Sequence, residues 1–322
     1  MTKLALETLP APPAGKTGWP WTVASSAPPE DRSDWPRISV VTPSYNQGEY
    51  IEATIRSVLL QNYPNLEYFI MDGGSTDNSV DVIRRYEPWV TQWVSEPDRG
   101  QSHAINKGLD QGTGQIFAWL NSDDQLLPDA LWRVAEAYRQ QPEAAAWAGT
   151  CHLIRADGRI IKSEVPRGLT RDGLADWYYG GFFFQPSCFF SARAWQAING
   201  VDESLNFAMD FDLALRLAEQ GPYVKLPDAL SAAIIHEEAK TQALRPEMHA
   251  ELMYVQIKYG YDQLAFKRLR QLLEATAEKE RRQASLSVQL KRKLRQWFPK
   301  NGRNEQYIQF LPNSYGPNRA NG

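Results

Sequence analysis

The chain has 322 residues, of which 43% are hydrophobic, 11% aromatic and 23% charged, and its formal net charge is −3. This composition excludes collagen-like, disulfide-scaffold and wholly disordered chains, and no apolar stretch approaches the roughly 18 residues that a membrane-spanning helix needs. Two cysteines, Cys151 and Cys188, cannot build a disulfide framework and are expected to be reduced core thiols. The length predicts one domain of about 200 to 250 residues with appendages, or two modest domains.

The first 36 residues differ in composition from the rest of the chain. Seven of the 21 prolines lie there, interleaved with Trp19, Trp21 and Trp35. This pattern is typical of an extended leader rather than a domain. The tryptophans have two interpretations, docking on the body of the protein, which we favour, or recognition by a partner. Because the amino-terminal end lacks a long apolar run, we expect no secretory signal and a cytoplasmic protein.

From Arg37 onward, short β-branched or aromatic runs alternate with a helical period. The first predicted strands are 38–42, 67–71, 91–95 and 115–120. Between the first two strands, Ile51, Ile55, Val58 and Leu59 recur as one apolar face of a helix does. The β-α-β-α order predicts an α/β fold with a Rossmann-like, mostly parallel sheet flanked by helices.

Later elements are less regular. We expect a helix over 130–138, an apolar strand at 145–148, a hairpin turn at 156–159 and a strand near 187–190. A helix starts at Asp210 and stops at Gly221-Pro222. An apolar strand at 232–235 follows, and the chain then turns helical and basic as far as Pro299.

Polar residues follow each of the first four predicted strands. In parallel sheets the ligand crevice lies beyond the carboxyl ends of the strands, so these residues are the candidate site. Asp123 and Asp124 could hold a hard cation such as Mg²⁺ or Mn²⁺, or could form an acidic turn that caps the next helix. The turn that starts at Asp72 could meet a nucleotide or could be a structural connector.

Read in order, five motifs resemble family 2 glycosyltransferases. They are Ile38 to Asn46 (ISVVTPSYN), Ser57 to Pro64 (SVLLQNYP), Met71 to Asp77 (MDGGSTD), Ala104 to Gly108 (AINKG) and Leu120 to Asp124 (LNSDD). The resemblance implies a GT-A fold, an inverting reaction, a nucleotide-diphospho-sugar donor and a divalent metal, Mg²⁺ or Mn²⁺. It extends more loosely to about residue 240.

The resemblance also implies roles for individual residues of the donor site. Thr42, Pro43 and Tyr45 would edge the base pocket, and Asp72 would contact the base or ribose. Asn106 and Lys107 would lie near the nucleotide. The segment Asn121-Ser122-Asp123 occupies the place of the family's Asp-x-Asp metal motif.

The metal motif departs from the family pattern at its first position. Asn121 replaces a carboxylate there, so Asp123 must carry most of the metal binding, and the loss of one anion should weaken cation affinity. His236 ends an apolar strand where the family often places a histidine near the metal or diphosphate. A structural histidine is the alternative interpretation, because Glu237 and Glu238 depart from the family pattern.

The segment Met209-Asp210-Phe211-Asp212 is similar to the family's Glu-Asp-x-Asp segment. The resemblance implies that Asp210 deprotonates the acceptor hydroxyl, which requires a carboxylate opposite the leaving diphosphate. The alternative is a carboxylate at a helix start, favoured by the helix dipole. We expect Asp212 to support the loop or the fold, and Gln185-Pro186-Ser187 to line the acceptor pocket or to form a Pro turn.

Residues 267–303 hold twelve Lys or Arg and three Glu, a local charge of +9 that leaves −12 for the remainder. Leucines recur at helical spacing among the basic residues of 281–298. This basic amphipathic helix predicts binding to an anionic membrane. The protein would then have a peripheral location at the inner face of the membrane. Packing against the acidic body or a second subunit is the alternative. No recognition module indicates nucleic acid.

We therefore predict three segments, namely a leader (1–36), a GT-A domain (37–240) and a helical, basic carboxy-terminal extension (241–322). The predicted enzyme moves a sugar from a nucleotide diphosphate, with UDP favoured, to a hydroxyl of a glycan or lipid-linked acceptor in surface polysaccharide synthesis. A sugar-phosphate nucleotidylyltransferase would need a Gly-rich loop with a basic end after the first strand, which is not present. A catalytically silent nucleotide- or glycan-binding subunit of a membrane assembly is the alternative from another class.

Overall fold

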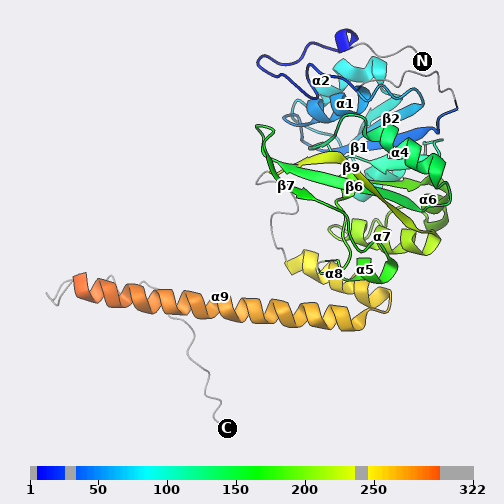
Figure 1. The fold of residues 1–322 in the computed structure, drawn as a ribbon. Coiled ribbons are helices and arrows are strands. Elements are labelled where there is room, and N and C mark those ends of the chain that lie inside the picture. The colour runs from blue at the N-terminus through cyan, green and yellow to red at the C-terminus, as the bar shows by residue number, and fades with distance from the viewer. Residues whose placement is uncertain (1–5, 26–33, 178, 236–245, 298–322) are drawn as a thin grey trace. The chain divides into compact units, whose positions relative to one another are not determined.

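The computed structural model describes residues 6–25, 34–177, 179–235 and 246–297. The chain divides into two compact units, residues 1–261 and 262–322 (Figure 1). The first unit contains the sheet and every described residue of the predicted site. The second consists, in its described part, of a single long helix.

The first unit begins with a short turn of 3-10 helix at Leu6–Thr8 and continues as an α/β domain. Its strands are β1 (Ile38–Ser44), β2 (Leu66–Asp72), β3 (Gln92–Ser95), β4 (Ile116–Trp119), β5 (Asp124–Leu126), β6 (Ala146–Ile154), β7 (Ile160–Glu164), β8 (Cys188–Ser191) and β9 (Tyr223–Ile234). Its α-helices are α1 (Ile51–Leu59), α2 (Ser79–Tyr86), α3 (Gln101–Leu109), α4 (Ala130–Gln140), α5 (Arg171–Ala175), α6 (Ala192–Ile198), α7 (Met209–Gln220) and α8 (Pro246–Lys258). Short 3-10 turns lie at Glu87–Trp89 and Gln185–Ser187.

The strands form one sheet in the order β3-β2-β1-β4-β8-β6-β9-β5, with β7 paired to β6. The first four strands are parallel, as the β-α-β-α pattern predicts. Beyond β4 the sheet is mixed, because β8 runs antiparallel to both β4 and β6 while β9 runs parallel to β6. The α/β class is confirmed, and the parallel arrangement belongs to the first half of the sheet.

Register brings the carboxyl ends of the first three strands to one edge. Ser44 of β1 is paired with Asp72 of β2, and Asp72 is paired with Ser95 of β3. On the other side of β1, Val41 is paired with Trp119, the last residue of β4. The polar residues that follow these strands therefore start from neighbouring positions, which is where parallel sheets bind ligands.

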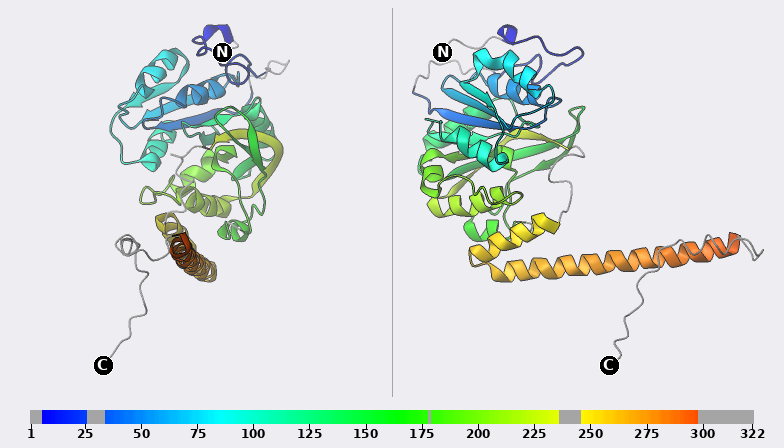
Figure 2. Two further views of the ribbon diagram at one scale, coloured as in Figure 1. Left: turned by 90° about the vertical axis from the view of Figure 1, so that its left-hand side faces the viewer. Right: turned by 180° about the vertical axis from the view of Figure 1, so that it is seen from behind.

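Helices cover both faces of the parallel strands (Figure 2). Every residue of α1 is buried, and its apolar side joins the main core with Val40 and Ile70. Helix α3 packs against β1 and β2, and its Gly108 lies against β1. A Cβ on Gly108 would lie 2.6 Å from a Val41 methyl group, so a larger residue would push α3 off the sheet.

The described part of the leader docks on the domain. Arg56 of α1, 1% exposed, donates hydrogen bonds to the carbonyl oxygens of Pro10, Pro20 and Trp21 at 2.8–3.0 Å. The Trp19 indole N–H donates to the Leu126 carbonyl at 2.8 Å. The described tryptophans therefore act as anchors on the domain, in agreement with the docking interpretation.

Helix α9 spans Asp262–Trp297 and forms the second unit as far as it is described (Figure 1). Phe266, Leu269 and Leu273 are exposed on it and recur at a spacing that keeps them on one side of a helix. Among the residues that the structure describes, no helix has the length and apolar content needed to cross a bilayer.

Candidate functional site

The loop after β1 is tied to the loop after β2 by four backbone N–H groups. Asn46, Gln47 and Gly48 donate to the side chains of Ser75, Ser79 and Asp77 at 2.8–2.9 Å, and the Thr76 N–H donates to the Asn46 side-chain oxygen at 2.8 Å. Two loops far apart in sequence thus form one rigid wall.

The three residues predicted to edge the base pocket lie at this wall. Thr42 and Pro43 are buried in β1, and the Thr42 hydroxyl is 3.0 Å from the Tyr68 hydroxyl. Tyr45 is 61% exposed, so its ring is available to stack on a base. The neighbouring Ser44 Oγ is buried and has no hydrogen-bond partner among the described residues.

Asp72 organises the turn that it begins. Its carboxylate accepts from the N–H groups of Gly74 and Ser75 at 3.1 and 2.9 Å and from the hydroxyls of Ser75 and Ser95 at 2.5 and 2.7 Å. This side chain therefore shapes the turn between β2 and α2 and ties it to the end of β3. Next to it, a Cβ on Gly73 would lie 2.8 Å from an Asp98 oxygen, so the sequence needs glycine where the Asp98 carboxylate approaches.

Residues 121–124 lie directly beyond β4. The Asn121 side chain bridges α3 and the acidic pair, because its oxygen accepts from Gln101 at 2.7 Å and its NH₂ donates to Asp124 at 3.1 Å. Ser122 and Asp124 are buried and Asp123 is half-buried. Burial, followed by the charge of Asp123, raises the pKa of the Asp124 carboxyl well above its usual range. A cation bound here would relieve this repulsion.

Asn106 and Lys107 lie on α3 near the same edge and already have protein partners. Asn106 exchanges hydrogen bonds with the backbone of Val201 at 2.9 and 3.0 Å and donates to Glu203 at 3.2 Å. Lys107 is ion-paired with Glu96. In this arrangement Asn106 ties α3 to the segment that leads into α7, and its predicted place near the nucleotide stays a prediction.

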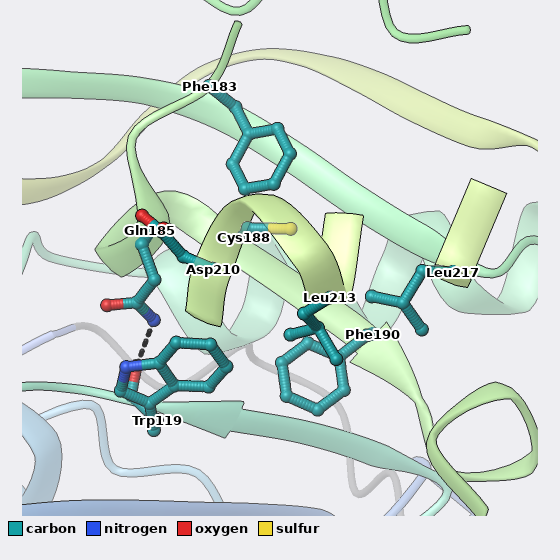
Figure 3. Close-up of a pocket in the computed structure, with 8 residues that line it drawn as sticks. All are labelled: Trp119, Phe183, Gln185, Cys188, Phe190, Asp210, Leu213 and Leu217. Carbon is teal, nitrogen blue, oxygen red and sulfur yellow. Dashed lines mark hydrogen bonds between the residues drawn. The ribbon is translucent and has the colours of Figure 1, made fainter. Parts of the chain in front are cut away.

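Asp210 lies at the start of α7 and lines a cavity in the carboxy-terminal half of the sheet. The other lining residues are Trp119, Phe183, Gln185, Cys188, Phe190, Leu213 and Leu217 (Figure 3). Burial raises the pKa of Asp210 from 3.8 to about 6, although the Phe211 N–H donates to its carboxylate at 2.8 Å. Asp210 is thus a carboxylate that can accept a proton near neutral pH.

Trp119 joins the two halves of the candidate site. It ends β4, two residues before Asn121, and its ring lines the Asp210 cavity. Its carbonyl oxygen accepts from the Gln185 side chain at 2.8 Å. The predicted acceptor segment is therefore in contact with the strand that carries the predicted metal motif, although the two are more than sixty residues apart.

The two other residues of the base segment have different surroundings. Asp212 is fully buried and accepts from Arg216, Lys258 and Tyr259 at 2.6–3.0 Å, so it supports the fold as predicted. Met209 is buried, and its sulfur accepts a hydrogen bond from the Ser102 hydroxyl at 2.8 Å. Only Asp210 of this segment reaches the cavity.

Sequence reasoning did not identify Glu251, which holds the loop before α7. Its carboxylate accepts from the N–H groups of Asn206, Phe207 and Ala208 at 2.6–3.1 Å. These donors lie in the loop that leads into α7, and the last of them, Ala208, is the residue that caps the helix. No local signal marks this glutamate, because its partners lie more than forty residues away on another element.

A metal would depend on few protein ligands in this structure. His236 lies outside the described residues, so its proposed metal contact stays a prediction. Within the described ranges, no group of three His, Cys, Asp or Glu side chains could enclose an ion. Asp123, with Asp124 beside it, stays the predicted donor set, and so few carboxylates would suit only an ion that shares its coordination with substrate phosphates and water.

Comparisons with known proteins agree with the fold. Residues 39–195 match the family described as "Glycosyl transferase family 2". Chondroitin synthase of Escherichia coli is 29% identical over 207 residues, which cover 63% of this chain and 29% of the synthase. An uncharacterised glycosyltransferase of Mycobacterium tuberculosis is 30% identical over 189 residues, 57% of this chain and 69% of the relative.

The fold is similar to that of a solved structure. The crystal structure of S. aureus TarS 1–349 in complex with UDP-GlcNAc superposes with a TM-score of 0.56, at 18% identity, over 72% of this chain and 71% of that one. The architecture is therefore that of a GT-A glycosyltransferase. The chain belongs to glycosyl transferase family 2. It spans less than a third of the length of the chondroitin synthase that it matches.

Proposed function

We propose that the protein is an inverting glycosyltransferase that uses a UDP-sugar. One observation carries the proposal, namely that Trp119 connects the loop of Asp123 to the cavity of Asp210. A single strand end thus separates a candidate diphosphate site from a carboxyl whose pKa is raised to about 6. The TarS complex with UDP-GlcNAc supports the choice of a UDP-sugar.

In this proposal Asp210 acts as the general base. Its carboxylate takes the proton of an acceptor hydroxyl while the hydroxyl oxygen attacks the anomeric carbon of the donor sugar. The bond between that carbon and the diphosphate oxygen breaks, and the diphosphate leaves with the electron pair. Attack on the face opposite the leaving group inverts the anomeric configuration. The low polarity around Asp210 keeps its proton affinity high enough for the task.

The donor would lie along the wall formed by the loops after β1 and β2. Tyr45, which is exposed, would stack on the base. Asp123 would hold Mg²⁺ or Mn²⁺ beside the diphosphate, with Asn121 and Ser122 shaping the loop. Such an ion stabilises the negative charge of the leaving diphosphate. His236 is the further ligand proposed from the family resemblance.

The acceptor is proposed to be a hydroxyl of a glycan or of a lipid-linked sugar, in surface polysaccharide synthesis. The similarity to chondroitin synthase supports this acceptor class. Helix α9 is proposed to bind an anionic membrane, because exposed Phe266, Leu269 and Leu273 precede the basic residues of 281–298. Co-sedimentation with phosphatidylglycerol vesicles, but not with phosphatidylcholine vesicles, would be the expected result. Equal sedimentation with both would contradict it.

The test of the donor site is calorimetric titration of the full chain with UDP, GDP, dTDP and CDP, with and without Mn²⁺ or Mg²⁺. We expect selective, metal-dependent binding of UDP that Asp123→Ala abolishes. Asp81→Ala is the matched control, since it removes an exposed carboxylate on α2. Binding by Asp123→Ala equal to that of the unaltered protein would contradict the assignment of Asp123.

A second assay separates an enzyme from a silent binding subunit. Release of UDP from UDP-sugars, with and without added acceptors, is expected of the enzyme and should fall by about 10²- to 10⁴-fold in Asp210→Asn. UDP binding without UDP release from any UDP-sugar would favour the silent subunit. That alternative draws its support from the neutral Asn121 in the metal motif.

A further inference from the structure

Helix α1 and the turn that follows it carry a polar stripe, Thr54, Ser57 and Gln61, inside the core. All three residues are fully buried, and their spacing of three and four keeps them on one side of the helix. Ser57 and Gln61 belong to the second family motif, for which the sequence indicates no role. A buried hydroxyl or amide without a partner costs free energy, so the partners of these side chains show what the stripe holds.

Each side chain of the stripe forms a hydrogen bond with the backbone of one segment, residues 122–131. The partners are the carbonyl oxygens of Ser122, Asp124 and Leu127 and the N–H groups of Leu126 and Leu131, at 2.7–3.2 Å. This segment begins in the predicted metal motif and continues through β5 into α4. Because the bonds reach main-chain atoms, the stripe fixes the course of the backbone there.

Thr54 holds the part of this segment that contains Asp123. Its hydroxyl donates to the carbonyl oxygens of Ser122 and Asp124 at 2.9 and 2.7 Å, one on either side of Asp123. A hydroxyl within a helix commonly donates to a carbonyl of the preceding turn, and Ser57 does so, to the Thr54 carbonyl at 2.7 Å. The Thr54 hydroxyl has one proton, and both of its acceptors lie outside its own helix. It therefore ties α1 to the loop of Asp123.

We propose that Thr54 is a positioning residue of the donor site, whose hydroxyl fixes the backbone on both sides of Asp123 and thereby the place of that carboxylate. The proposal rests on the proposed role of Asp123 beside the diphosphate. Because Thr54 is fully buried, it acts through the loop and not by contact with the donor or a cation. A carboxylate that is already held in place loses little freedom on binding a cation. Loss of the hydroxyl should therefore weaken cation binding and leave the wall formed by the loops after β1 and β2 intact.

The experiment measures how UDP binding by the full chain depends on the concentration of Mn²⁺. Thr54→Val removes the hydroxyl and keeps the shape of the side chain. The Mn²⁺ concentration for half-maximal UDP binding should rise about tenfold, as loss of one hydrogen bond predicts, and saturating Mn²⁺ should restore UDP affinity to within about twofold. Thr54→Ser retains the hydroxyl and should keep the Mn²⁺ midpoint within about twofold of that of the unaltered protein.

Ser39→Ala is the matched control. Ser39 is also fully buried and its hydroxyl donates to Glu67 at 2.7 Å, but it lies at the end of β1 remote from the predicted site. This variant loses a comparable hydrogen bond and should leave the Mn²⁺ midpoint unchanged. Thr54→Ala, which lacks the hydroxyl and adds no methyl group in its place, takes the place of Thr54→Val if that variant does not fold.

The outcomes separate the role of Thr54 from that of Asp123. An unchanged Mn²⁺ midpoint in the variant without the hydroxyl would overturn the proposal. A rise of the same size in Ser39→Ala or Thr54→Ser would overturn it too, and so would a loss of UDP binding that saturating Mn²⁺ does not reverse. UDP binding by the unaltered protein that is absent, or independent of Mn²⁺, would instead refute the proposed role of Asp123, and the role of Thr54 with it.

Discussion

Replacement of Asp210 by Asn should stabilise the protein while abolishing its activity. Burial raises the pKa of this carboxyl from 3.8 to about 6 in the folded state. The difference of about two pKa units corresponds to roughly 3 kcal/mol against the ionised, folded form. This is an upper value, because the side chain is only half-buried. Asn keeps an oxygen that can accept from the Phe211 N–H, so the substitution removes the charge and retains the hydrogen bond.

The sign of the effect depends on pH. Below about pH 4 the carboxyl is protonated in both states, and the substitution changes little. Between about pH 4 and 6 the unfolded chain loses the proton and the folded chain keeps it, so stability falls as pH rises. Above about pH 6 the penalty is complete. The gain in stability of Asp210→Asn should therefore grow across this window and then level off.

Urea unfolding of both proteins near pH 5 and near pH 8 measures the effect directly. The unfolding free energy of Asp210→Asn should exceed that of the unaltered protein by more at the higher pH. In the unaltered enzyme, kcat/KM should rise with pH through about 6, as the base ionises. The same difference in unfolding free energy at both pH values would refute the reasoning, because it would mean that Asp210 titrates alike in both states.

Three further substitutions test the supports of the site. Glu251→Gln should lower kcat and reduce the free energy of unfolding by about 1 to 2 kcal/mol, because three backbone N–H groups lose a charged acceptor. An unchanged kcat would contradict the positioning role of Glu251. Asp212→Asn should lower the free energy of unfolding by about 3 to 5 kcal/mol, because Arg216 and Lys258 lose their buried counter-charge. A loss below about 1 kcal/mol in urea unfolding would argue against that network. Arg56→Met should release the leader, because each lost charge-assisted hydrogen bond is worth about 1.5 to 3 kcal/mol. The release would be measured as faster proteolysis within residues 6–25, and protease resistance equal to that of the unaltered protein would count against this anchor.

Local pattern was sufficient for the first half of the fold. The runs that end near Thr42 and Met71, and the apolar face from Ile51 to Leu59, have the periods of strands and a helix, and the structure has them at β1, β2 and α1. Local burial and period decide these elements, so a single sequence can reveal them. The mixed pairing after β4 was not visible in this way, because β8 and β9 pair with strands remote in sequence.

Motif order proposes residues for the site but does not say what each one touches. Asp72 and Asn106 were expected near the nucleotide, and both have their polar atoms engaged by the protein, in a turn and in the tie to Val201. The partners of a side chain depend on which loops meet, and that depends on register and packing. The predictions for their contacts with a nucleotide remain open to the binding experiments.

The sequence alone determined the class of the fold and supplied the predictions for the donor site and the base, because these depend on local period and on residues in a fixed order. The tertiary structure decided the rest of the site. It placed Trp119 and Gln185 against the Asp210 cavity, and it brought Glu251 of α8 to the start of α7. Burial and long-range contact create these properties, among them the raised pKa of Asp210. Neither is a property of any short stretch of the chain.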